Sequence, residues 1–266
     1  GEFIEEQIYN WTYSDEQAAK KMWPTTHPND TNPYASLPRM VMLTYKVPDE
    51  IIDVARGGEY NSFDLNAFFE ARGEGDSAEF VMKEHVQKWL NLMRGSYMPQ
   101  SHDDLKLGAQ KPALPYSDMR LLNVLNHTVW YLPRVNSCYA MRNLLSEPQN
   151  TFFRDYQINV AAGVEAGVGL AALERVQETM QDPLKSKTIT LTCGKLTTGV
   201  TVKPWTGIFM LTNMRSPETY FQAAFRVQSP WTVKGDNGEE EIIKQECYVF
   251  DFALDRSLRM VSDYSC

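Results

Sequence analysis

A glutamine and an arginine near the end of the chain have the types and spacing to act on phosphate groups. Gln222 and Arg226 lie four residues apart, so in a helix both point the same way. An arginine can stabilise the charge that develops on a transferring γ-phosphoryl group, and a glutamine can position water or the phosphate beside it. These two residues are therefore candidates for contacts with phosphate groups, and the alternative is an ordinary surface glutamine and arginine on an amphipathic helix.

The helix that carries them has clear start and stop signals. Ser216-Pro217-Glu218 predicts its start, because serine caps free amides, proline suits the first turn and an acid favours the positive end of the dipole. Pro230 predicts its end, because the residue before a proline is pushed out of the α region. We expect a helix over residues 217–228.

A loop rich in glycine and threonine precedes this helix and follows a β-branched run at residues 188–192. Glycines let a backbone approach a phosphate closely, and hydroxyls donate to its oxygens. The alternative is a plain strand-end turn with solvated threonines, and the helix that follows at a suitable distance favours the functional interpretation. The candidates for nucleic-acid contacts are Thr192, Gly194, Thr197 and Thr198, and those for the nucleotide cofactor are Gly199, Thr201 and Arg226.

This order of strand, loop, strand and helix resembles motifs V and VI of superfamily 2 helicases and DNA translocases. Motif V of that family reads roughly T-x-G-x-x-T-T/R-G-V/L-x-V/I, and motif VI is usually Q-x-x-G-R-x-x-R. The residues that match motif V are Thr192, Gly194, Thr197, Thr198, Gly199, Val200 and Val202. Gln222 and Arg226 match motif VI, whereas Phe225 replaces its glycine and Ser229 its second arginine. The resemblance implies that Arg226 and Gln222 are catalytic residues and that Arg226 reaches across an interdomain cleft to the γ-phosphate of ATP. It also implies that the glycine and threonine loop and the helix of Arg226 lie at neighbouring strand ends on one rim of that cleft.

The resemblance extends to the start of the chain. Residues 1–17, GEF-x-EEQIYNWTY-x-DEQ, look like a segment that follows motif III in helicase subunits of type III and related restriction systems. It implies that Gly1 is not a native start and that a first RecA-like domain precedes it. The partners implied are that domain, DNA, and nuclease or methyltransferase modules, and the implied cofactor is ATP with Mg²⁺.

The chain lacks the motifs that would hold ATP by themselves. Gly194-Lys195-Leu196-Thr197 resembles the end of a Walker A motif, but Leu196 stands where serine or threonine is needed and no glycine lies four residues earlier. No acidic motif II is present in the 266 residues. We therefore expect ATP to be bound mainly by a domain absent from this chain, which alone would be inactive.

Composition narrows the class of protein. A hydrophobic content of 43% and a charged content of 23% are ordinary for a globular domain. The net charge of −8 argues against broad electrostatic binding of nucleic acid but leaves room for local phosphate contacts from amides and hydroxyls. No apolar run approaches the ~20 residues that span a bilayer, and no secretory signal is visible. The four cysteines and four histidines are not spaced as metal ligands, so we predict no metal site. From the missing apolar run and secretory signal we predict a cytoplasmic protein with no membrane partner.

Strand and helix signals alternate along the second half, which predicts an α/β fold with a RecA-like parallel sheet flanked by helices. We divide the chain into an accessory region, 1–115, mostly helical or irregular, and a second RecA-like domain, 116–266. Ser14 and Asn136 are the expected caps of two helices. The expected strands are 39–45, 128–132, 156–161, 188–192, 205–211 and 246–254, and the expected helices 15–22, 64–69, 79–93, 136–145, 168–180 and 217–228.

Two other functions stay open. Residues 167–172 match G-x-G-x-x-A, the turn with which a Rossmann-like enzyme binds NAD or S-adenosylmethionine. Against it, the strand after this turn ends without an acid that could hold a ribose. The second alternative is a non-catalytic interaction domain derived from a helicase, for which Ser229 in place of arginine is the main sign.

Overall fold

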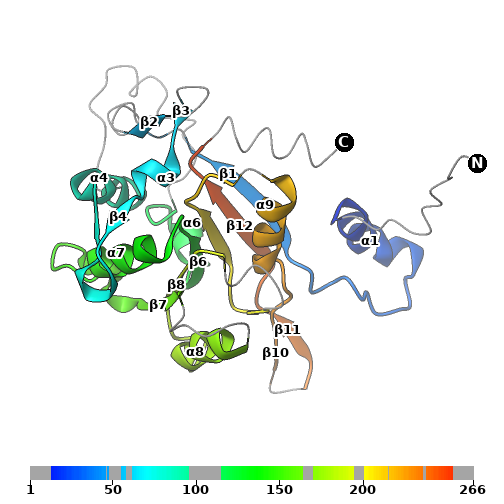
Figure 1. Cartoon of the computed structure of the whole chain (residues 1–266). Helices are drawn as coiled ribbons and strands as arrows, with labels where there is room; N and C mark the ends of the chain where they lie inside the picture. The colour runs from blue at the N-terminus through cyan, green and yellow to red at the C-terminus, as the bar shows by residue number, and fades with distance from the viewer. Residues whose placement is uncertain are drawn as a thin grey trace, which may run out of the picture.

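The computed structural model describes residues 13–45, 47, 55–57, 62–95, 115–163, 170–194, 201–214, 216–235 and 238–253. Its centre is a six-stranded sheet in which every neighbouring pair of strands is parallel (Figure 1). The strands lie in the order β1 (Arg39–Thr44), β12 (Glu246–Asp251), β9 (Gly207–Met210), β6 (His127–Tyr131), β8 (Thr188–Thr192) and β7 (Gln157–Ala161). The predicted fold class, a parallel sheet flanked by helices, is confirmed.

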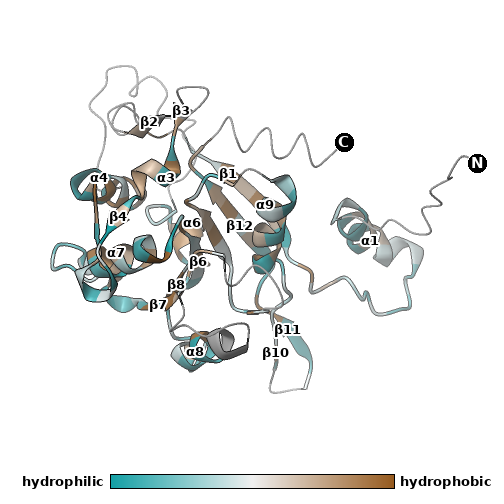
Figure 2. Ribbon diagram, in the orientation of Figure 1, coloured by the Kyte–Doolittle hydropathy of each residue, from teal (hydrophilic) through white to brown (hydrophobic). Residues whose placement is uncertain are grey.

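Helices cover both faces of the sheet because successive strand residues face opposite sides and both sets are apolar. In β9, Phe209 belongs to one hydrophobic cluster, whereas Ile208 and Met210 belong to another. The first cluster includes residues of α4 (Lys83–Met93) and α7 (Val135–Leu145), and the second includes residues of α8 (Leu170–Met180) and α9 (Pro217–Ala224). In Figure 2 the strands of the sheet are largely coloured as apolar, and polar residues lie on the helices around them.

Smaller elements surround this core. The described hairpins are β2 (Arg56–Gly57) with β3 (Ser62–Phe63), β4 (Ala71–Arg72) with β5 (Glu79–Phe80), and β10 (Thr232–Lys234) with β11 (Glu240–Ile242). The remaining helices are α1 (Tyr13–Thr26), α3 (Leu65–Phe68), α6 (Met119–Leu122), and the 3-10 turns η2 (Gly75–Ser77), η3 (Thr151–Asp155) and η4 (Phe225–Val227). Helix α1 contains no buried residue and lies outside the sheet, which it reaches where the Tyr13 hydroxyl accepts from the Met40 amide (Figure 1).

Residues from both sides of the expected domain boundary share one core. Strand β1, which precedes residue 115, pairs with β12 over six residues. Trp89 of α4 is fully buried, and its ring meets those of Trp130 on β6 and Phe252 after β12 edge to face, with centroids 6.1 and 5.1 Å away. The division at residue 115 stays a prediction, and the packing predicts that the two regions unfold together.

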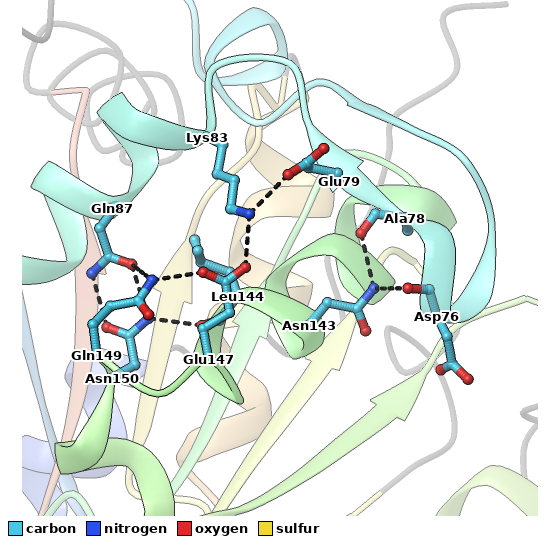
Figure 3. A network of polar contacts seen from close by, with 10 residues as sticks. All are labelled: Asp76, Ala78, Glu79, Lys83, Gln87, Asn143, Leu144, Glu147, Gln149 and Asn150. Atoms are coloured by element: carbon cyan, nitrogen blue, oxygen red, sulfur yellow. Dashed lines mark hydrogen bonds and ion pairs between the residues drawn. The ribbon is translucent and has the colours of Figure 1, made fainter.

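A polar seam fastens the first region to α7 and the turn after it (Figure 3). Lys83 pairs with Glu79 and with Glu147, both at 2.8 Å, and these carboxylates raise the pKa of Lys83 to about 12. Gln87 and the buried Asn150 exchange amide hydrogen bonds of 2.8 and 2.9 Å. On α7 itself, the Asn143 amide donates to three carbonyl oxygens, those of Gly75, Asp76 and Ala78.

Several helix boundaries differ from the sequence predictions. Ser14 lies inside α1 instead of capping it. Asn136 does not cap α7, because Arg134 is the N-cap residue and the Asn136 amide donates to the Ala71 carbonyl at 2.5 Å. The helix expected over 79–93 begins at Lys83, since Glu79 and Phe80 pair as β5. For Asn136 a tertiary hydrogen bond outweighs the local signal, and for Glu79 and Phe80 the pairing with β4 does.

Replacing Trp89 with alanine should lower the free energy of unfolding by about 3–5 kcal/mol, because it opens a cavity at the junction of the two regions. Urea unfolding followed by circular dichroism would measure it, with the partly exposed Val81→Ala as a control expected to stay within ~0.5 kcal/mol. A second unfolding transition, with the sheet unaffected by Trp89→Ala, would contradict the shared core.

Candidate functional site

The described site residues predicted for nucleic acid lie at the carboxyl ends of the strands. Thr192 is the last residue of β8, and its buried hydroxyl donates to the Ala161 carbonyl at 3.0 Å, which ties β8 to the end of β7. Gly194 has a φ of +104°, a conformation that favours glycine, and a side chain there would meet the Tyr131 hydroxyl at 3.4 Å. Thr192 thus positions the start of the loop, and Gly194 lets the chain turn beside Tyr131.

The rest of this loop is only partly described. Thr197, Thr198 and Gly199 lie outside the described residues, as do the glycines at positions 167 and 169 of the alternative dinucleotide turn. Thr201 is exposed and leads into Val202, which is buried. The loop connects β8 to β9, which are not neighbours, because β6 lies between them.

The expected common rim is wrong for the described part of the loop, because Thr192 and Gly194 lie at the carboxyl ends of the strands, whereas Arg226 lies near the amino end of β9. Helix α9 begins after the carboxyl end of β9, where the Ser216 hydroxyl accepts from the Thr219 amide at 3.3 Å, as predicted for this cap. The helix then returns toward the amino ends of the strands. The expected helix over 217–228 ends at Ala224 and continues as the 3-10 turn η4, which carries Arg226. Arg226 is half-buried, and burial lowers the pKa of its guanidinium.

Gln222 is exposed on α9, one turn before Arg226. Its side-chain amide donates to a carboxylate oxygen of Glu218 at 3.3 Å. This contact holds the amide at the surface, where a ligand from another domain could reach it. The structure therefore keeps Gln222 and Arg226 on one continuous segment, with one exposed and the other half-buried.

A buried lysine that sequence analysis missed joins the segment of Arg226 to the segment after Thr201. Lys244 follows β11 and is 2% exposed. Its ammonium donates to the carbonyl oxygens of Lys203, Trp205 and Val227, at 2.7, 2.8 and 2.9 Å. Burial lowers the pKa of Lys244 to about 7. The sequence gives no sign that Lys244 is buried, because a single lysine after two isoleucines matches no known pattern.

A second buried contact fixes α9 to the sheet at its other end. The Tyr220 hydroxyl donates to Asp251 Oδ2 at 3.0 Å, and both side chains are buried. Asp251 is the last residue of β12, and its other carboxylate oxygen accepts from the Ala253 amide at 2.8 Å. The segment from Ser216 to Val227 is therefore held near both of its ends by buried polar groups.

The chemistry that these residues offer is contact with anionic groups. Arg226 provides a guanidinium suited to phosphate oxygens, and Thr201 provides an exposed hydroxyl on the segment that leads into β9. Within the described ranges, no cluster of three or more histidine, cysteine, aspartate or glutamate side chains could hold a metal ion. No helix in the part of the chain that the structure describes is long and apolar enough to cross a bilayer.

The fold and site define a parallel α/β domain with an arginine-bearing segment at one end of its sheet. The chain is similar to a protein of Mycoplasma pneumoniae (strain ATCC 29342 / M129 / Subtype 1) named "Putative type II restriction enzyme and methyltransferase RM.MpnORF110P C-terminus". The two are 26% identical over 269 residues, which cover 98% of this chain and 36% of that relative. The chain thus spans about a third of the relative's length. No family model matches the chain.

Two solved structures also resemble it. The crystal structure of T4 UvsW aligns with a TM-score of 0.39 and 11% identity, covering 82% of this chain and 32% of that one. The C-terminal part of the Fun30 ATPase domain aligns with a TM-score of 0.36 and 10% identity, covering 67% and 54%. Likeness at this level does not define a function.

The lowered pKa of Lys244 predicts a pH dependence of stability. Between about pH 7 and the ordinary lysine pKa of 10.5 the folded chain binds fewer protons than the unfolded chain, so the free energy of unfolding should rise with pH there. The contribution is at most ~1.4 kcal/mol per pH unit.

Urea unfolding of the wild type and of Lys244→Met at pH 7 to 10 would isolate this contribution. Both proteins should carry Cys247→Ala, because burial raises the pKa of this nearby thiol to about 12 and the charge of Lys244 lowers it, so its titration would otherwise differ between them. If both proteins show the same slope against pH, the prediction is wrong.

Proposed function

We propose that this chain is the second RecA-like domain of an ATP-dependent superfamily 2 DNA helicase or translocase that belongs to a restriction system. It would contribute Arg226 and Gln222 to ATP hydrolysis and the loop after β8 to contacts with DNA. A preceding RecA-like domain of the same protein would bind most of the ATP and its Mg²⁺. The proposal includes a cytoplasmic location and attached nuclease or methyltransferase modules.

The observation that carries the proposal is the place of the matched residues on an all-parallel sheet. Thr192 ends one strand and Gly194 follows it, and Arg226 lies in the 3-10 turn after the helix that follows another strand. After Thr192 the chain passes to the amino end of β9, follows β9 to its carboxyl end, and returns along α9 toward the amino ends of the strands. One continuous segment could therefore contact a nucleic acid at one end of the sheet and a nucleotide at the other.

The similarity to the Mycoplasma pneumoniae protein supports the restriction setting. That relative carries restriction and methyltransferase functions in its name, and this chain aligns along nearly its whole length with part of it. The net charge of −8 fits a domain that grips a phosphate backbone with hydroxyls and amides, while other domains supply positive charge.

The residues of this chain fit the role of completing an ATP site. Arg226 would neutralise charge on the transferring phosphoryl group and is part-desolvated, which strengthens such an interaction. Gln222, exposed beside it, would orient water or the phosphate. In this proposal the preceding domain would bind the Mg²⁺ together with most of the ATP.

Replacing Arg226 with alanine in the full-length protein should lower the kcat of DNA-stimulated ATPase by about 10³-fold or more, as for other arginine fingers. The KM for ATP should change little, because the other domain would supply most of the binding. Arg175→Ala, at an exposed position of α8, serves as the control and should keep wild-type kcat. An unchanged kcat in Arg226→Ala would remove the finger role and favour the non-catalytic interaction domain.

Replacing Thr198 with alanine should weaken DNA binding several-fold without changing its dependence on salt, because a hydroxyl donor releases no counterions. Fluorescence anisotropy with labelled DNA at several salt concentrations would measure both quantities. Thr219→Ala, on the exposed side of α9, is the control. Equal DNA affinity in both variants would exclude the loop from the DNA interface.

A further inference from the structure

We propose that Lys244 is a positioning residue for Arg226. Its buried ammonium would hold the main chain beside Arg226 against the segment that leads from Thr201 into β9. The inference rests on the proposed role of Arg226 and adds a residue that no resemblance points to. Lys244 would act through carbonyl oxygens and not by touching the nucleotide.

The geometry around Lys244 matches an ammonium group. The protonated group has three N–H donors, and the structure offers three carbonyl acceptors at 2.7–2.9 Å from its nitrogen. These acceptors come from distant parts of the sequence, 41, 39 and 17 residues before Lys244. A buried side chain with all its donors occupied has one orientation, so it fixes the relative position of the two segments.

The acceptor next to Arg226 is the carbonyl oxygen of Val227, which lies at the end of a helix. Regular helix ends at Ala224, and the three residues of η4 follow. Carbonyl groups at a helix end lack partners within the helix, and a lysine there satisfies one and suits the negative end of the dipole. Lys244 supplies this contact at Val227, directly after Arg226. The backbone position of Arg226 therefore depends on a residue from another part of the chain.

The other two acceptors connect the same ammonium to the loop that ends at β9. Trp205 is fully buried and packs in the same hydrophobic cluster as Val227. Lys203 lies two residues after Thr201, a predicted nucleotide contact. Lys244 thus fixes the position of the loop end relative to the segment that carries Arg226. Such a fixed position is needed if Thr201 and Arg226 contact the same phosphate group.

Steady-state ATPase kinetics of the full-length protein test the inference through a double-mutant cycle. Lys244→Met, which keeps the apolar stem and removes the donors, should lower kcat about tenfold or more and leave the KM for ATP within about threefold. Added to Arg226→Ala, it should cause no further loss, because residues that act through one group are not additive. Lys234→Met, an exposed lysine of the adjacent hairpin, is the control for charge.

A kcat of Lys244→Met equal to that of the wild type, or losses that multiply in the double variant, would overturn the positioning role. If Arg226→Ala itself keeps full kcat, the proposed function fails. The inference about Arg226 then falls with it, whereas a loss in Arg226→Ala combined with no effect of Lys244→Met rejects the positioning role alone.

Hydrogen exchange of this chain supplies a readout independent of activity. Peptides covering residues 201–206 and 225–228 should exchange at least tenfold faster in Lys244→Met, whereas residues 217–221 should not change. Tyr220→Phe, which removes the other buried anchor of α9, should show the opposite pattern. Should Lys244→Met fail to fold, Lys244→Gln keeps two donors and should show the same pattern more weakly. Uniform acceleration over all of α9 would indicate a general structural role and contradict the inference.

Discussion

Burial of both faces of an all-parallel sheet is the constraint on which the rest of this structure depends. Parallel strands need crossover connections, and helices in those connections cover the faces. Strand residues therefore alternate between two apolar cores, as Phe209 and Met210 do in β9. For the same reason α4, from residues before 115, packs on one face of the sheet, and β1 forms its edge. What looks like an accessory region in the sequence thus completes the core.

Parallel topology also decides where functional residues can lie. All strands point the same way, so loops that follow strands share one end of the sheet, and residues at the ends of crossover helices return to the other. Thr192 and Gly194 lie at the first end, and Arg226 near the second. A single stretch of chain spans both. If it contacts DNA and nucleotide as proposed, movement at one end would reach the other through α9 and β9.

Buried polar groups give this stretch its defined position. Apolar packing alone is tolerant of small shifts, whereas an unpaired buried donor or acceptor is costly, so each polar contact selects one arrangement. Tyr220 with Asp251 fixes the first half of α9, and Lys244 fixes the turn after it. Both contacts join residues that are distant in sequence. They lie on the face of the sheet opposite to the aromatic cluster around Trp89 and Trp130.

The sequence by itself determined the fold class, the central strands, and the start of α9 at Ser216, because hydrophobic period and cap chemistry are local. Only the tertiary structure decided the strand order, with β6 between β8 and β9, and the pairing of β1 with β12. The tertiary structure also determines that Asn136 donates to the Ala71 carbonyl instead of capping a helix. It likewise determines that Lys244 is buried against main-chain carbonyl oxygens. Such contacts join groups tens of residues apart, and no local pattern encodes which of many polar side chains will be buried together.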